Sequence, residues 1–148
     1  MASADIEAII EIEGPPERVW QVMTDTALAW RWLGAFGFRL KVGQTFVMQP
    51  SRRRRETDDL AGAIPCRLEV IDPNRRLRFS WMYPGRPATD VAIALTPIHG
   101  GTHVRLTHEG WEAYEDDVDP ADMEAALLAI GEAWSEEVLP TLKALVEG

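Results

Sequence analysis

Apolar and polar residues alternate in the segment 6–13, close to the N-terminus. A period of two predicts a β-strand with one buried face. The residues on that face are Ile6, Ala8, Ile10 and Ile12, and most of the residues between them are acidic. The strand is expected to end at Gly14, because two prolines follow it.

Two short helices are predicted directly after this strand. Pro16 suits the first turn of a helix, and Glu17 stabilises the positive end of the helix dipole. A second helix start is indicated by the segment 24–26 (TDT), because Thr and Asp are good N-caps. This second helix is expected to run through Trp32.

The middle of the chain alternates between strand patterns and turn compositions. Gly, Pro, Asn and Asp gather in the short stretches between the apolar runs, at lengths that suit hairpins. Strands that are joined by hairpins pair antiparallel. The predicted strands are 36–42, 44–49, 65–71, 77–83, 88–96 and 102–109.

The segment 120–146 has the pattern of one long helix. Asp119 is suited to the N-cap and Pro120 to the first helical position. Pro140 lacks a backbone donor, so it should kink or split the helix near Val138. The apolar residues step by three, four and seven, which gives one face: Met123, Leu127, Ile130, Trp134, Val138, Leu142 and Leu145.

These elements predict a single α+β domain over residues 1–148. An antiparallel sheet must cover its apolar face, and the last helix is the element long enough to do so. We therefore expect a curved seven-stranded antiparallel sheet wrapped around a long C-terminal helix, with two short helices after the first strand. Such an arrangement can leave a gap between the sheet and the helix.

Composition narrows the classes of function. The formal net charge is −9, which argues against binding to nucleic acid or to an anionic membrane. Cys66 is the one cysteine, so an internal disulfide is excluded. The first residues carry acids and no basic region, and no apolar run is long enough to span a membrane. We expect a cytoplasmic protein.

Several motifs, taken in order, resemble those of a known superfamily. They are 15–20 (PPERVW), 72–77 (DPNRRL) followed by Phe79-Ser80-Trp81, the strand that begins at Gly101-Thr102, and the helix around Trp134. The chain resembles the START-like, or SRPBCC, helix-grip superfamily. Within it, the chain is similar to the bacterial homologues of the activator of the heat-shock-protein ATPase. The resemblance implies a helix-grip fold with an apolar cavity between the sheet and the terminal helix.

The first functional hypothesis is a non-catalytic protein that binds a small apolar or amphipathic ligand in this cavity, without a cofactor. The apolar residues that face inward on the strands and on the last helix would also suit a packed core. Polar contacts would come from His108 and Thr102. The expected apolar walls are Trp32, Phe79, Trp81, Val91, Ile93, Val104, Leu106, Ile130 and Trp134.

His108 is the one imidazole on the inward face and the one candidate for acid–base chemistry. No second group at a fixed spacing accompanies it, so a histidine satisfied by a neighbour is the favoured interpretation. His99 lies in a turn and His103 on the opposite strand face, so no metal site is expected. Cys66 is expected to be inert packing.

Two other functions stay open. A cyclase- or aromatase-type enzyme would need an acid–base pair that points into the cavity. A chaperone-type partner protein would need an exposed apolar or charged docking surface. The oligomeric state is also open, and a homodimer is compatible with the sequence.

Four adjacent arginines, Arg52 to Arg55, are the sharpest local irregularity. They could hold an anion or contact an acidic partner. The favoured interpretation is an exposed, mobile hairpin tip whose charge is offset by Glu56, Asp58 and Asp59.

Overall fold

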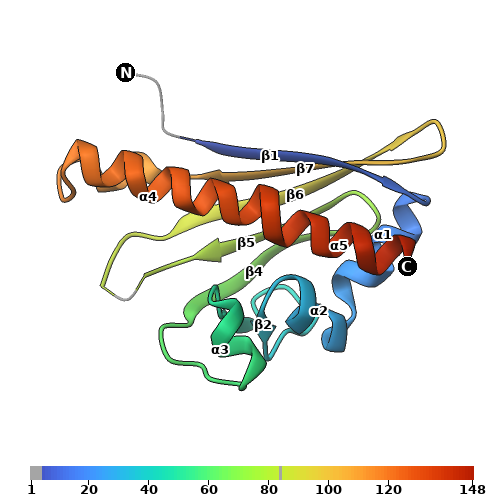
Figure 1. Cartoon of the computed structure of the whole chain (residues 1–148), viewed down its shortest axis with the longest axis horizontal. Coiled ribbons are helices and arrows are strands. Elements are labelled where there is room, and N and C mark those ends of the chain that lie inside the picture. The colour runs from blue at the N-terminus through green and yellow to red at the C-terminus, as the bar shows by residue number, and fades with distance from the viewer. Residues whose placement is uncertain (1–4, 84) are drawn as a thin grey trace.

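An antiparallel sheet curves around one long C-terminal helix in the computed structural model, which describes residues 5–83 and 85–148 (Figure 1). The sheet has seven strands in the order β1-β7-β6-β5-β4-β3-β2. This confirms the predicted sheet, the terminal helix and the two short helices after the first strand. The strands are β1 Ile6–Glu13, β2 Ala35–Phe36, β3 Thr45–Met48, β4 Ile64–Asp72, β5 Arg76–Trp81, β6 Thr89–Ile98 and β7 Gly101–Glu109.

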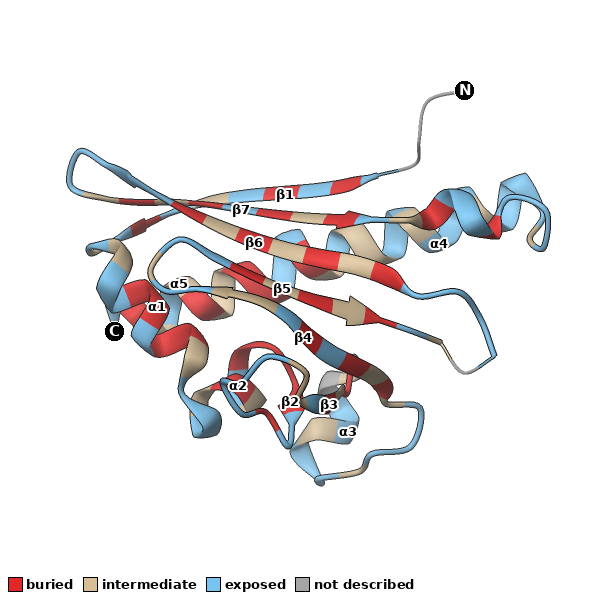
Figure 2. Cartoon of the chain, turned by 180° about the vertical axis from the view of Figure 1, so that it is seen from behind, coloured by how far each residue is buried: buried red, intermediate tan, exposed pale blue. Residues whose placement is uncertain are grey.

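The strands bury one face each, as their alternation predicts. In Figure 2 buried residues alternate with intermediate or exposed ones along most of β1, β6 and β7. The pairing sets Ile6 opposite His108 and Val91 opposite the same histidine from the other side. The inward residues of neighbouring strands therefore lie side by side and form one continuous core.

The helices other than the terminal one are short. They are α1 Pro16–Thr24, α2 Thr26–Trp32, α3 Arg52–Glu56 and a 3₁₀ turn, η1, at Trp111–Tyr114. Asp25 caps α2 by accepting hydrogen bonds from the backbone N–H groups of Ala27 and Leu28, at 3.0 and 3.1 Å. This N-cap agrees with the predicted helix start.

The terminal helix has three parts: α4 Pro120–Ala133, a π-helical turn η2 Trp134–Val138, and α5 Leu139–Glu147. The N–H of Leu139 bonds to the carbonyl of Trp134, five residues back. Pro140 has no N–H, and its ring would crowd the preceding turn of a regular α-helix. The wider π-turn accommodates the proline, so the α-helix is interrupted near Val138 while the ribbon continues in one direction (Figure 1).

The structure differs from the sequence predictions at three points of local structure. The predicted strand 36–42 is reduced to β2, because Gly37 and Gly43 take positive φ angles of 78° and 86° and turn the chain. Strict alternation in the predicted strand 65–71 would place Val70 on the same face as Cys66 and Leu68, but a β-bulge between Leu68 and Val70 shifts the alternation, so Ile71 pairs with Leu77.

The third difference concerns Arg52 to Arg55, which lie in the connection of the β3–β4 hairpin, as predicted, but form most of a short helix, α3, there. Ser51 caps this helix by accepting a hydrogen bond from the N–H of Arg54 at 3.3 Å. Arg54 makes an exposed ion pair with Asp59 at 2.9 Å, and Arg55 is half-buried. Among the described residues, no helix is long and apolar enough to cross a membrane.

Candidate functional site

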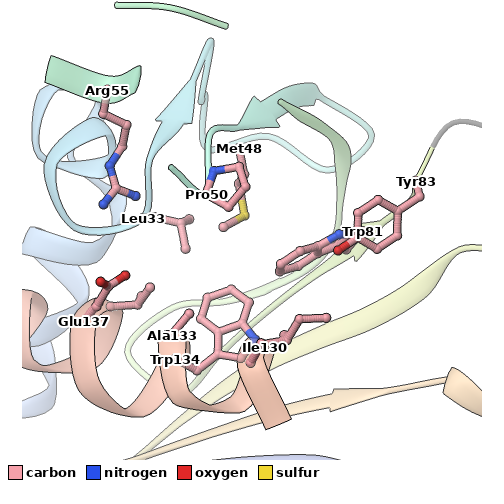
Figure 3. A pocket seen from close by; sticks show the side chains of 12 residues that line it. Leu33, Met48, Pro50, Arg55, Trp81, Tyr83, Ile130, Ala133, Trp134 and Glu137 are labelled. Carbon is pink, nitrogen blue, oxygen red and sulfur yellow. The ribbon is translucent and has the colours of Figure 1, made fainter. Parts of the chain in front are cut away.

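An apolar pocket of about 190 Å³ lies between the C-terminal helix and one end of the sheet (Figure 3). Residues from β3, β5, α3, the terminal helix and the loops after α2 and β3 meet around it. Its polar side chains are few and come from Arg55, Tyr83 and Glu137. The complete lining is Leu33, Met48, Pro50, Arg55, Trp81, Tyr83, Ala129, Ile130, Ala133, Trp134, Glu137 and Val138.

Two tryptophans form the inner wall of the pocket. The rings of Trp81 and Trp134 pack edge to face, with centroids 5.4 Å apart and planes at 71°. Both side chains are buried, at 5% and 2% exposure. Aromatic pairs prefer this geometry, because the positive edge of one ring meets the negative face of the other. The wall therefore offers the pocket apolar surface from β5 and from the helix.

His108 lies behind this wall and is fully buried. The indole N–H of Trp134 donates to His108 Nδ1 at 3.2 Å. An indole N–H can only donate, so Nδ1 is unprotonated and the ring proton sits on Nε2. Nε2 then donates to Thr89 Oγ1 at 2.7 Å, and that hydroxyl donates to the carbonyl of Trp81 at 3.0 Å.

This chain of hydrogen bonds fixes the tautomer of His108, and burial keeps the ring neutral. Burial lowers the pKa of the imidazole to about 3, because the cation would lose its hydration. The ring also lies against Trp81 and Trp111, each with a centroid 4.6 Å away. His108 is therefore a neutral residue that links β7, β6 and the helix, and both of its nitrogens are occupied.

The residues predicted to bind a ligand divide into two groups. Trp81, Ile130 and Trp134 line the pocket. The others are buried within the core and are not among the pocket residues: Trp32, Phe79, Val91, Ile93, Val104, Leu106 and His108. Thr102 is also buried and lies at the opposite end of β7 from His108, where its hydroxyl donates to the carbonyl of Gly14 at 2.8 Å.

Several lining residues were not predicted. Ala133 and Val138 could have been found, since they lie next to Trp134 and one turn beyond it on the same helix. Leu33, Pro50 and Arg55 come from loops and from α3, and the sequence pattern gives no signal for them. Tertiary contacts alone bring those segments to the pocket.

Gln49 is the residue that holds this loop region together. Its side chain is 1% exposed. Its amide nitrogen donates to the carbonyls of Asp59 and Ala61, at 2.9 and 2.8 Å. Its amide oxygen accepts from the N–H of Ser51 at 3.0 Å. The buried amide thus ties both ends of the α3 loop to β3 and sets the position of Arg55.

The described residues do not offer a metal site, since no group of His, Cys, Asp or Glu side chains lies close enough together. Cys66 is buried, and its thiol donates to the carbonyl of Ile64 at 3.4 Å. Burial raises the pKa of this thiol, so it stays protonated and poorly nucleophilic. The pocket lining offers apolar surface and a few polar side chains.

Comparisons with known proteins agree with the fold. The family model for the Activator of Hsp90 ATPase homolog 1-like protein matches residues 13–147. Protein MLL2253 from Mesorhizobium loti is similar in structure, with a TM-score of 0.76, 23% identity and coverage of 97% of this chain and 96% of that one.

Two further solved structures show the same fold. Protein BH1534 from Bacillus halodurans has a TM-score of 0.73 at 20% identity, over 96% of each chain. The Aha1 dimer from Colwellia psychrerythraea has a TM-score of 0.64 at 18% identity, over 99% of this chain and 95% of that one. No curated protein matches the sequence.

Proposed function

The chain belongs to the Activator of Hsp90 ATPase homolog 1-like family, and we propose that it binds a small apolar or amphipathic ligand in the pocket beside Trp81 and Trp134. The observation that carries this proposal is the apolar pocket of about 190 Å³ between the sheet and the helix. An engineered apolar cavity of about 150 Å³ stays dry and takes up benzene. A ligand body of one or two rings is therefore the expected size.

The driving force would be the removal of apolar surface from water. Each Å² of apolar surface buried contributes roughly 25 cal/mol. Met48, Ile130 and Ala133 supply aliphatic contacts around the two tryptophan rings. Because these side chains are already held by the core, binding requires little reordering of the protein.

The buried state of His108 supports binding rather than catalysis. An acid–base residue must reach the proton that it transfers. His108 is fully buried, and both of its nitrogens are engaged with Trp134 and Thr89. A cyclase-type mechanism that uses this histidine has no geometric support. A chaperone-type docking role would be supported by a large exposed patch on a protein that has no cavity. The apolar pocket of this protein instead favours ligand binding.

Isothermal titration with naphthalene tests the proposal. We expect micromolar to submicromolar binding at one site. Ala133→Phe should fill the pocket and weaken binding at least tenfold. Ala144→Phe is the matched control, because Ala144 is exposed on α5 and does not line the pocket. Absence of binding to the unmodified protein, or equal binding by both variants, would contradict the proposed function.

A further inference from the structure

A second hollow, which is polar, adjoins the apolar pocket. It has a volume of about 290 Å³ and is open to solvent at the surface between α2, α3 and the terminal helix. Arg55 and Glu137 line both hollows. The remaining lining residues are Trp30, Arg31, Glu56 and Thr141. A molecule seated in the apolar pocket would therefore meet Arg55 and Glu137 where the pocket opens into this polar hollow.

The side chain of Arg55 is held in place by a hydrogen bond to the backbone. Its Nη1 donates to the carbonyl of Gln49 at 3.1 Å. Gly34 lies directly against it with a φ of +73°. A Cβ on Gly34 would stand 2.8 Å from Nη1 of Arg55 and 2.5 Å from the carbonyl oxygen of Gln49. Glycine at this position therefore leaves the space that the guanidinium occupies.

Glu137 approaches the opening from the opposite side. It is exposed and belongs to the π-helical turn that begins at Trp134. Figure 3 shows the carboxylate of Glu137 and the guanidinium of Arg55 on facing sides of the same opening. One side of the opening thus presents hydrogen-bond donors, and the other side presents acceptors.

The formal charges of the residues that line the polar hollow sum to zero. Arg31 and Arg55 carry positive charges, and Glu56 and Glu137 carry negative charges. An anionic head would be attracted by the arginines and repelled by the glutamates, and a cationic head would meet the reverse. A head that both accepts and donates hydrogen bonds gains from both sides without a net charge to desolvate.

We propose that the ligand is amphipathic, with a ring-sized apolar body against Trp81 and Trp134 and a dipolar, amide-like head between Arg55 and Glu137. This inference rests on the proposed function, because it assumes that the apolar pocket is occupied. The head's oxygen accepts from Arg55, and its N–H donates to Glu137. Arg55 and Glu137 are then the residues that select the ligand's head.

Four probes that share one ring system test the head separately from the body. They are naphthalene, 2-naphthamide, 2-naphthoate and 2-naphthylmethylammonium, titrated at pH 7.5 by calorimetry. We expect 2-naphthamide to bind at least tenfold more tightly than naphthalene and more tightly than either ion. Equal affinity of the amide and naphthalene, or tightest binding by an ion, would overturn the inference. Failure of all four probes would instead overturn the proposed function.

Variants assign the effect to the two residues. In Arg55→Met and in Glu137→Met, the preference for 2-naphthamide over naphthalene should fall to within about threefold, because methionine offers neither the donor nor the acceptor. Glu137 is exposed, so its substitution keeps the test available even if Arg55→Met unfolds the α3 loop. Arg53→Met and Glu136→Met are matched controls, since both residues are exposed and line neither hollow. A preference that survives in Glu137→Met would refute the assigned role of that carboxylate.

Discussion

The indole N–H of Trp134 donates to Nδ1 of His108 at 3.2 Å, and this bond joins the terminal helix to β7. Trp134 begins the π-helical turn, so the bond fixes the helix at the point where its regular geometry changes. The same indole forms a wall of the apolar pocket. Pocket shape and helix position therefore depend on one buried pair.

The first prediction concerns pH. The pKa of His108 is lowered to about 3 in the folded protein, whereas an unfolded histidine titrates near about 6.5. Between these values the unfolded chain binds a proton that the folded chain does not. The free energy of unfolding should therefore decrease as the pH falls below about 6.5, by up to about 1.4 kcal/mol per pH unit. Above that pH the histidine has no effect on the slope.

His108→Phe removes this contribution. The variant should be less stable at pH 8 by about 1–3 kcal/mol, because the indole N–H of Trp134 loses its buried acceptor. Its stability should also fall less steeply between pH 6.5 and pH 4 than that of the unmodified protein. Urea denaturation across this range measures both effects. Parallel curves for the two proteins would show that His108 is not held neutral.

The second prediction separates the ring of Trp134 from its hydrogen bond. Trp134→Phe keeps an aromatic ring but leaves Nδ1 of His108 without its donor, at a cost of about 1–3 kcal/mol. Trp134→Ala also removes most of the packing and should cost about 3–5 kcal/mol. For Trp134→Ala we expect a loss near the lower end of this range, because part of the indole ring already borders the pocket and lacks packing partners there. Urea melts of both variants provide the measurement, and two equal losses would contradict this division.

The third prediction concerns Gln49. Gln49→Leu should reduce the free energy of unfolding by on the order of 3 kcal/mol, because three part-buried backbone groups lose hydrogen bonds to its buried amide. Gln21→Leu is the control. Gln21 is exposed on α1, and its substitution should change stability by less than about 0.5 kcal/mol. A neutral effect of Gln49→Leu in thermal denaturation would show that the α3 loop does not depend on this side chain.

The fourth prediction is that the arginine-rich helix α3 does not bind DNA. Arg54 is paired with Asp59, and Arg55 bonds to the carbonyl of Gln49. The net charge of −9 repels polyanions. A fluorescence titration at physiological salt should give binding weaker than that of dedicated binders, whose non-specific Kd is about 10⁻⁴–10⁻⁶ M. Salt-sensitive micromolar binding that is lost in an Arg53→Ser, Arg54→Ser double variant would refute this.

Local patterns predicted most of the fold, because most elements follow their own periodicity. The alternation in β1 and β7 and the stripe along the terminal helix are properties of neighbouring residues. The bulge after Leu68 is different, because it depends on how β4 pairs with β5. Helix α3 is also different, since it is stabilised by Gln49 and by a cap at Ser51 rather than by an apolar face.

The site was predictable to a smaller extent. Trp81, Ile130 and Trp134 lie on regular elements whose inward faces the sequence reveals. An inward residue can nevertheless be fully buried away from the pocket, as Phe79 and Ile93 are, and the period of the sequence does not show where the sheet and the helix separate. The sequence predicts a solvated position for Arg55, because no local signal shows that its side chain reaches the carbonyl of Gln49 after β3.

The most direct test of the account is to locate a bound ring by nuclear Overhauser effects between naphthalene and methyl-labelled protein. We predict contacts to the methyl groups of Met48, Ile130 and Ala133, which surround the pocket. Leu128 is the internal control for non-specific surface binding, because it is 64% exposed and does not line the pocket. Contacts confined to Leu128, or no contacts at saturating naphthalene, would contradict the claim that this protein holds an apolar ligand between its sheet and its terminal helix.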